Sequence, residues 1–379
     1  MRYPLTFLAL TLTLLAGSAD ARTWRIHPDG SGDAATIQAG IEAAAPGDTV
    51  LVSCGTYTEH DILLTTVGLV VRSESGQPDC VTIDAQRLGR VLYGQGLDAT
   101  TRIEGFTLTG GLSDRGGGGG FSAASPVIAD CLFIDNLSTF VGGGVDCRSA
   151  SSPAFDHCRF IDNEADWDGG GLYCLGASSP TLDNCEFIGN TSGHSGGGMR
   201  CEGLGSDPVL AHCTFSGNDS DFGGGFICYT SAEASLTNCT FSANAAASDG
   251  GGLYCGGFGV LTLSRTIVAY SGVGVGVFCE GASTATLSCC DLFANAAGDW
   301  VGEIAGQGGT DGNLGVDPQL CSTQPDADRN WMLQSDSPCA PGNHPQGTDC
   351  GVIGAWPVDC GTTPSERSTW GNIKARFRD

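Results

Sequence analysis

Five aspartates that could carry chemistry lie at one recurring turn of the sequence, directly before runs of glycine. They are Asp166, Asp168, Asp219, Asp221 and Asp249. Carboxylates that converge can bind calcium, which prefers oxygen ligands, or can act as an acid–base pair on a glycan. All five are therefore candidates for calcium binding, and Asp166, Asp168 and Asp221 are candidates for catalysis. The alternative is a solvated acidic turn, since no Asp-x-Asp-x-Asp-Gly calcium loop is present.

Aromatic residues share this turn and point to a second kind of chemistry. Phe140, Trp167 and Phe222 could stack on sugar rings, because an aromatic side chain offers a large apolar face. The sequence therefore marks these three as candidates for glycan binding. The alternative is that they are scattered surface aromatics with no ligand.

Arg265 is a further candidate for catalysis. It interrupts a row of cysteines, so a position expected in the core carries a charge. A buried charge needs a partner, so Arg265 either pairs with a carboxylate or marks a coil that bulges outward. In a lyase it could act as the base, and the alternative is an imperfect end coil.

The elements that must position these residues form a repeat of 27 residues. Five units read Cys-x-Phe-x-x-Asn, and each is followed by a Gly-Gly-Gly triplet and a second cysteine. The first cysteines are Cys131, Cys158, Cys185, Cys213 and Cys239. The asparagines are Asn136, Asn163, Asn190, Asn218 and Asn244. The second cysteines are Cys147, Cys174, Cys201, Cys228 and Cys255.

Within each unit the apolar residues alternate, as they do in β-strands. Cys131 and Phe133 fall on one face, whereas Leu132 and Ile134 fall on the other. Strands this short cannot form a stable sheet within one unit, but equivalent strands of successive units can stack about 4.8 Å apart. The repeat therefore predicts an all-β parallel β-helix, a solenoid of about nine or ten coils.

The repeated residues have physical reasons to recur. We expect Phe and Cys to stack in the core. Asn should form ladders and take the left-handed conformation at strand ends. Gly should allow a turn that a Cβ would block. Buried free thiols are favoured over disulfides in the cysteine rows, and zinc is disfavoured because no CxxC pairs occur. Disulfides are expected instead among Cys321, Cys339, Cys350 and Cys360.

The ends of the chain differ from the repeat. Residues 1–21 read as a signal peptide with a cleavage box at Ala19-Asp20-Ala21, so we expect export and no membrane-spanning segment after cleavage. An amphipathic helix over residues 35–45 should cap a β-helix that occupies residues 22–310. Residues 311–360 read as an irregular, Pro- and Cys-rich closure, and residues 361–379 as a linker with a short basic tail. This tail is either a docking or sorting signal or a frayed end.

The charge composition of the chain limits the molecules that it can bind. A net charge of −25 leaves no basic surface for nucleic acid. Calcium is the one cofactor that the acidic turn leaves open, and a polysaccharide or a cell surface is the expected partner.

The motifs resemble those of a known superfamily. The segment Thr36-Ile-Gln-Ala-Gly-Ile-Glu through Val50, followed by Gly55-Thr-Tyr57, is similar to the start of pectin-lyase-like right-handed parallel β-helix proteins. The stretch from Gly315 through Ser337-Pro-Cys339 to Ala355 resembles their closing segment. The Phe-x-x-Asn and Gly-Gly-Gly marks also resemble repeats of chlamydial polymorphic outer membrane proteins, which are adhesins. The resemblance implies a right-handed β-helix with its N-terminal helix cap.

This superfamily does not imply one function, because its fold hosts lyases, hydrolases, epimerases and adhesins. The Asn-Thr-Asp, Asp-Asp, Gly-His-Gly and Arg-Ile-Lys motifs of polygalacturonases are absent. The uniform coils favour a secreted or cell-surface protein without catalysis, used for adhesion, glycan contact or as a structural module. The alternative is a polysaccharide lyase or glycoside hydrolase.

Overall fold

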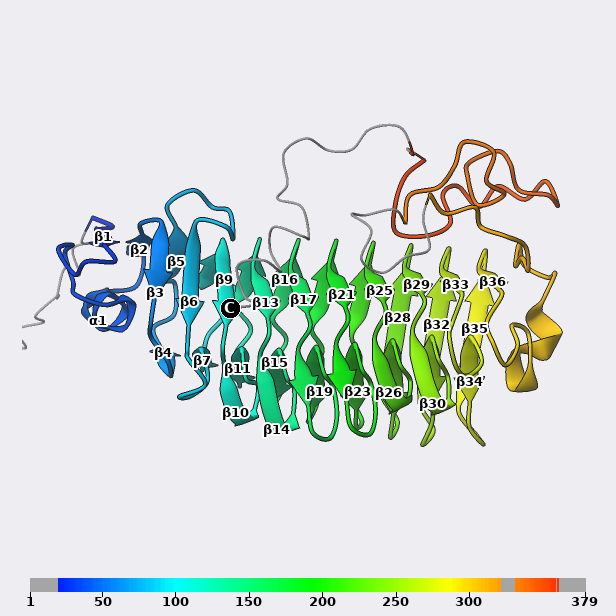
Figure 1. Cartoon of the computed structure of the whole chain (residues 1–379), viewed down its shortest axis with the longest axis horizontal. Helices are drawn as coiled ribbons and strands as arrows, with labels where there is room; N and C mark the ends of the chain where they lie inside the picture. Colours follow the sequence, from blue (N-terminus) through cyan, green and yellow to red (C-terminus); the bar gives the residue numbers. More distant parts are fainter. Residues whose placement is uncertain (1–19, 322–330, 359, 361–379) are drawn as a thin grey trace, which may run out of the picture.

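The computed structural model describes residues 20–321, 331–358 and 360. Over these residues the chain winds into a rod in which every strand pairs in parallel with its copies in the neighbouring coils (Figure 1). The largest of its sheets hold eleven and ten strands, which confirms the predicted parallel β-helix of about ten coils. The predicted signal peptide and basic tail lie outside the described residues, except for residues 20 and 21.

Four sheets, named A to D, run along the rod. Sheet A holds β1 (Thr23–Ile26), β2 (Thr49–Val52), β5 (Val70–Ser73), β8 (Arg102–Glu104), β12 (Val127–Ala129), β16 (Ala154–Asp156), β20 (Thr181–Asp183), β24 (Val209–Ala211), β28 (Glu233–Thr237), β32 (Val260–Ser264) and β35 (Thr284–Ser288). Sheet B holds β3 (Gly55–Tyr57), β6 (Val81–Asp84), β9 (Phe106–Thr109), β13 (Leu132–Ile134), β17 (Arg159–Ile161), β21 (Glu186–Ile188), β25 (Thr214–Ser216), β29 (Thr240–Ser242), β33 (Ile267–Ala269) and β36 (Asp291–Phe293).

Two shorter sheets lie between them. Sheet C holds β4 (Ile62–Leu64), β7 (Leu92–Gln95), β11 (Gly119–Ser122), β15 (Val145–Arg148), β19 (Leu172–Leu175), β23 (Met199–Glu202), β27 (Phe226–Tyr229), β31 (Leu253–Cys255) and β34 (Val277–Cys279). Sheet D holds β10 (Leu112–Arg115), β14 (Leu137–Val141), β18 (Glu164–Ala165), β22 (Thr191–Ser192), β26 (Asp219–Phe222) and β30 (Ala245–Asp249). In the regular region the chain passes from A to B to D to C and returns to A.

The core is a set of stacked ladders. Phe160 lies between Phe133 and Phe187, with ring centroids 5.1 and 4.5 Å apart and planes within 5°. Asn163 Nδ2 donates to Asn190 Oδ1 at 2.9 Å, and the same bond repeats from Asn136 to Asn244. These asparagines are buried, so the predicted ladder is confirmed. Stacking therefore satisfies the polar groups that each coil buries.

The left-handed residues beside this ladder differ from the prediction. The residue before each asparagine, not the asparagine itself, has positive φ: Asp135, Asp162, Gly189, Gly217 and Ala243. The asparagine side chain can then turn inward to its neighbours in the ladder. The first glycine of each triplet does have positive φ, between 61° and 69°, as expected.

The cysteine rows are only partly as predicted. Cys131, Cys158, Cys185, Cys213 and Cys239 are buried free thiols. In the second row Cys174 and Cys201 form a disulfide, which corrects the expectation of free thiols there. Their Cα atoms face each other in register, 4.7 Å apart, which is close enough for bonding.

The irregular cysteines also pair differently from the expectation. Cys321 bonds Cys360, whereas Cys350 bonds Cys289, which lies between β35 and β36. Cys339 was expected to form a disulfide but is a buried free thiol. A further disulfide joins Cys54 and Cys80, which the sequence did not predict.

The two ends of the rod are covered differently. Helix α1 (Ile37–Ala43) begins at Thr36, whose Oγ1 accepts from Ala39 N–H, and buries Ile37 and Ile41 against the first coils. At the other end the 3₁₀ helix η1 (Gly302–Gln307) places Ile304 in the main core. At the start of the Pro- and Cys-rich segment Leu314 pairs with Asp291 of the last coil, and farther along Leu333, Ile353 and Trp356 pack on the outer face of sheet B (Figure 1). None of the described helices has the length and apolarity required to cross a membrane.

Candidate functional site

The acidic turn of the sequence is the connection from sheet D to sheet C. Its glycine triplets fit only because they lack side chains: a Cβ on Gly170 would lie 2.3 Å from the carbonyl oxygen of Thr191. The coils keep one register through this connection, since Val141 pairs with Asp168 and Asp168 pairs with Ser195. Residues at equivalent positions therefore form rows along the rod.

Phe140, Trp167 and His194 occupy equivalent positions, and Phe222 lies one position later, in register with Ser195. We call Phe140, Trp167, His194 and Phe222 the aromatic row. The Trp167 and His194 rings stack at 4.9 Å with 13° between their planes, and Phe222 lies 5.8 Å from His194. Phe140 is 42% exposed and Trp167 is 50% exposed, so both offer apolar surface to solvent. The structure thus brings the three predicted glycan-binding residues onto one edge and adds His194 between them.

Beyond Phe222 the rings continue with Tyr254, which is buried, and Phe278, which is half-buried. Phe222 meets Tyr254 edge-on at 5.7 Å, and Tyr254 stacks on Phe278 at 5.2 Å. The Tyr254 hydroxyl donates to Glu280 Oε2 at 2.8 Å, which fixes its ring. Burial, together with this carboxylate, raises the pKa of Tyr254 well above its usual value. The exposed part of the row is therefore supported at one end by rings that are held in place.

Asp168 supports the row from beneath. Its Oδ1 accepts from Ser195 Oγ at 2.6 Å and from Arg200 at 3.2 Å, and it lies 3.0 Å from Nδ1 of His194. The Asp168 side chain is only 6% exposed and the Arg200 side chain 8%. Ser195 and His194 both contact the carboxylate, and no contact between them is found in the described part of the chain. The cluster is therefore an ion-pair network that orients His194, not a nucleophile–base arrangement.

The other four aspartates do not join Asp168. Asp166, Asp219 and Asp221 are exposed, and Asp249 is half-buried on β30. Partial burial raises the pKa of Asp219, and the nearby Asp221 carboxylate adds to this effect. Across residues 20–321, 331–358 and 360, no group of three or more His, Cys, Asp or Glu side chains is placed to hold a metal ion. The five predicted calcium ligands thus do not assemble into one cluster.

Arg265 lies elsewhere and does not interrupt the cysteine row. Register places Thr240 opposite Ile267, so Thr266 follows Cys239 in the row, and Thr266 is fully buried. Arg265 instead occupies the corner between sheets A and B, where each coil from Asp130 to Cys289 has a residue with φ near +50°. The equivalent corner residues are Asp130, His157, Asn184, His212, Asn238 and Cys289. Its charge therefore lies outside the core, which corrects the expectation of a charge in that row.

Among the comparisons with known proteins, the family match shows the fold. A family described as right handed beta helix region matches residues 91–268 and 165–306, which together span more than half of the chain. Among solved structures, the crystal structure of pectate lyase Pel9A is similar over 90% of this chain and 97% of that chain, with 12% identity and a TM-score of 0.48. The search of curated proteins found no match.

Proposed function

The chain belongs to the family of right-handed β-helix proteins, and we propose that it is a secreted or cell-surface protein that binds a glycan along its aromatic row without catalysis. The aromatic row is the observation that carries the proposal. Four rings from successive coils line one edge of the rod, and the two most exposed are Phe140 and Trp167. The four disulfides are consistent with an oxidising compartment outside the cytosol.

The spacing of the row suits a polysaccharide that runs along the rod. Successive coils are roughly 4.8 Å apart, because that is the separation of hydrogen-bonded strands. A sugar ring has a similar length, so neighbouring sugars could each meet a ring of the row. Stacking of the apolar faces of sugars on aromatic rings needs no reacting group, and the rings are already in place before a ligand arrives.

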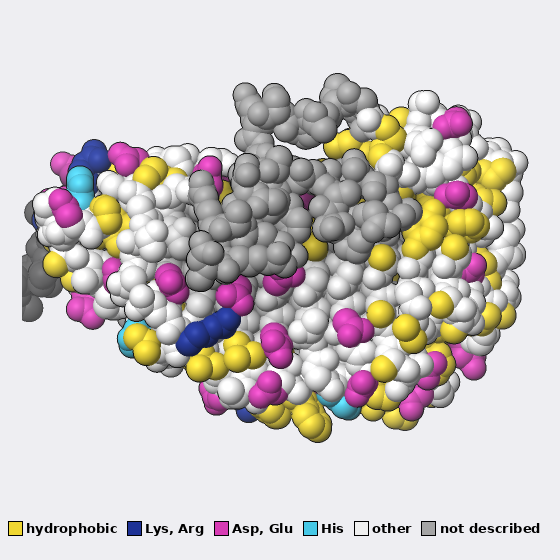
Figure 2. All heavy atoms as spheres, viewed as in Figure 1, with side chains coloured by type: hydrophobic (Ala, Val, Ile, Leu, Met, Phe, Trp, Pro, Cys, Tyr) yellow, Lys and Arg dark blue, Asp and Glu magenta, His cyan; other side chains and the backbone are white. Residues whose placement is uncertain are grey.

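The charges beside the row favour a neutral or cationic glycan. Asp166, Asp219 and Asp221 are exposed on the same side of the rod as Trp167 and Phe222. The whole chain carries a charge of −25, and Figure 2 shows acidic side chains scattered over the visible face with few basic ones. A polyuronate would meet repulsion here, whereas the ammonium groups of an amino sugar polymer would be attracted.

The state of Asp168 supports binding without catalysis. A glycosidase needs two carboxyl groups that face the same bond, one of them held protonated. Asp168 is buried against Arg200, so it is unavailable to a substrate. The raised pKa of Asp219, with Asp221 two residues away, is the one observation that favours the alternative of a glycoside hydrolase.

A binding assay with matched variants tests the proposal. The mature protein is incubated with insoluble chitin, cellulose and chitosan and with polygalacturonate, and the fraction retained is measured. We expect retention on a neutral or cationic polymer, with affinity reduced roughly 3- to 10-fold in Trp167→Ala through the loss of about 0.5–1.5 kcal/mol of stacking. Phe258→Ala is the control, because Phe258 is 69% exposed but lies between sheets C and A, outside the row.

Three outcomes would contradict this function. Equal retention of Trp167→Ala and the wild type would show that the row does not bind the polymer. Preferential retention on polygalacturonate would contradict the charge argument. Release of shortened or unsaturated products would replace the proposal with the enzymatic alternative, and Asp219→Asn and Asp221→Asn would then be the variants to assay.

A further inference from the structure

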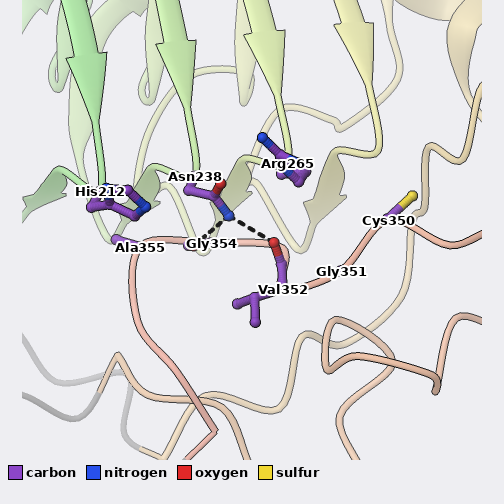
Figure 3. A pocket seen from close by; sticks show the side chains of 8 residues that line it. All are labelled: His212, Asn238, Arg265, Cys350, Gly351, Val352, Gly354 and Ala355. Atoms are coloured by element: carbon purple, nitrogen blue, oxygen red, sulfur yellow. Dashed lines mark hydrogen bonds between the residues drawn. The ribbon is translucent and has the colours of Figure 1, made fainter.

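A pocket of about 290 Å³ lies where the C-terminal segment crosses the corner between sheets A and B. Figure 3 shows His212, Asn238 and Arg265 side by side at successive corners, with the segment from Cys350 to Ala355 running along them. This corner carries none of the residues of the aromatic row, which lies at the connection from sheet D to sheet C. The pocket is therefore a separate candidate site.

The walls of the pocket are fixed by direct bonds. Asn238 Nδ2 donates to the carbonyl oxygens of Val352 at 2.7 Å and Gly354 at 3.3 Å (Figure 3). The N–H of Gly354 donates to the carbonyl oxygen of Arg265 at 2.8 Å. A disulfide from Cys350 to Cys289 closes one side. The cavity is thus largely formed before a ligand binds, as most small-molecule sites are.

Gly354 shows how closely the segment approaches the coils. It has φ +105°, and a Cβ on it would lie 2.7 Å from Cδ1 of Ile267 and 3.1 Å from Oγ1 of Thr240. The next residue, Ala355, donates its N–H to Thr240 Oγ1 at 2.9 Å. The close fit holds the segment in one position over the corner.

Arg265 carries a charge for which the described residues show no counter-charge. Its Nε is fully buried and has no hydrogen-bond partner. No ion pair to its guanidinium is found among residues 20–321, 331–358 and 360. Other arginines of this acidic chain, such as Arg159 and Arg200, do have carboxylate partners. Arg265 lines the pocket, so an anionic ligand bound there would supply the counter-charge.

We propose that this pocket binds a small organic carboxylate. The planar guanidinium of Arg265 can hold both oxygens of a carboxylate at once. The N–H groups of Gly351 and Val352, which also line the pocket, have no acceptor in the described part of the chain, so further donors are available. The side chains of Val352 and Ala355 offer apolar contact to the body of the ligand.

The charges around the pocket and the volume of the pocket limit the kinds of carboxylate that can bind. The carboxylate of Asp183 lies 3.0 Å from Nδ1 of His212 at the edge of the pocket. With this neighbour and a net charge of −25, the site favours a singly charged carboxylate over doubly charged phosphate. A cavity of about 290 Å³ is at the lower end of the range for small-molecule pockets, so the ligand has about the size of one ring.

Calorimetric titration of the mature, disulfide-intact protein tests this site. The probes are acetate, benzoate and glucuronate, with glucose as the uncharged match for glucuronate and phosphate as the dianion. We expect at least one carboxylate to bind, glucose and phosphate to bind at least 10-fold more weakly, and Arg265→Gln to weaken carboxylate binding by 10-fold or more. The arms with benzoate and glucuronate distinguish a free organic acid from the acidic sugar of a glycan.

Matched variants keep the result interpretable. Arg25→Gln removes an exposed arginine far along the chain and should leave binding unchanged. Arg265→Lys keeps the charge but loses the paired donors, so it should bind with intermediate affinity. Saturating carboxylate should raise the melting temperature of the wild type but not of Arg265→Gln, and this second readout requires only that the variant folds.

The proposal is overturned if no carboxylate binds the wild type, if phosphate binds more tightly than every carboxylate, or if Arg265→Gln binds as well as the wild type. Because the aromatic row is not involved, Trp167→Ala should retain full carboxylate binding. Failure of the glycan proposal and failure of this one are therefore distinguishable.

Discussion

The buried carboxyl group of Asp291 should make the folded protein less stable as the pH rises from about 4 to 7. This aspartate is fully buried on β36, with Oδ1 accepting from the N–H of Val316 at 3.1 Å and Oδ2 lying 3.3 Å from Sγ of Cys339. Burial raises the pKa of Asp291 from 3.8 to about 7, because it removes the carboxylate from water, and the nearby Asp299 and Asp317 add to this effect. The group therefore prefers its neutral form in the folded chain.

The sign follows from proton binding. Well below its unfolded pKa of 3.8, Asp291 is protonated in both folded and unfolded chains, so its contribution to stability is fully present. As the pH rises from about 4 to 7, the unfolded chain releases this proton first, and stability falls until the folded group has also ionised. A pKa difference of about three units corresponds to a loss of about 4 kcal/mol across this window.

The perturbation is Asp291→Asn, which keeps the shape of the side chain but cannot ionise. Unfolding free energies of both proteins are measured in urea by tryptophan fluorescence at intervals from pH 4 to pH 9. Other carboxyl groups titrate in both proteins, so the difference between the two curves isolates Asp291. We expect the variant to gain up to about 4 kcal/mol relative to the wild type between pH 4 and pH 8.

A matched control is Asp311→Asn, which changes an exposed aspartate in the same region. Its curve should run parallel to that of the wild type. Parallel curves for Asp291→Asn as well would refute the reasoning, because they would mean that Asp291 is charged or solvated in the folded protein.

Two further predictions concern the ladders. Asn190→Ala should reduce the unfolding free energy by about 3 kcal/mol or more. The backbone N–H and the Nδ2 of Asn163 would lose their acceptor, and the carbonyl oxygen of Phe160 would lose a donor. Urea unfolding checks this against Thr191→Ala, which changes an exposed neighbour and should have little effect. Gly170→Ala should destabilise the protein by about 1–3 kcal/mol or prevent folding, because the new Cβ would lie 2.3 Å from the carbonyl oxygen of Thr191. The control is thermal melting of Gly306→Ala, because Gly306 has open space around it. This control should match the stability of the wild type within about 1 kcal/mol. Equal melting of the two glycine variants, or an unchanged Asn190→Ala, would mean that the triplets and the ladder do not carry the stability assigned to them.

The coil could be predicted from the sequence because each repeated residue has one function in the stack. Phe160 must meet Phe133 and Phe187, and Asn163 must meet Asn136 and Asn190, so a fixed spacing of these types leaves few alternative structures. The same logic placed Trp167 on the turn beside the glycine triplets. Local periodicity was therefore sufficient for the fold and for the position of the aromatic row.

Contacts between distant parts of the chain could not be predicted in this way. The Trp356 indole donates to Thr214 Oγ1 at 2.8 Å across 142 positions of sequence, and no periodic signal connects the two residues. The pocket beside Arg265 depends on this same segment, so the sequence gives no indication of it. Arg265 itself was misplaced by one position, because the regular spacing of 27 residues from Cys239 leads to Thr266, a buried residue that is not a cysteine.

The ladders also determine where function can arise in this rod. A buried ladder position is constrained by its copies above and below, so changing Asn190 or Phe187 would disturb three coils at once. The corner between sheets A and B has no such constraint, since it holds residues as different as His212, Asn238 and Arg265, all with φ near +50°. A residue at a corner can therefore change its chemistry without disturbing the stack. The two sites proposed lie at such positions, one at the connection from sheet D to sheet C and one at the corner that the C-terminal segment covers.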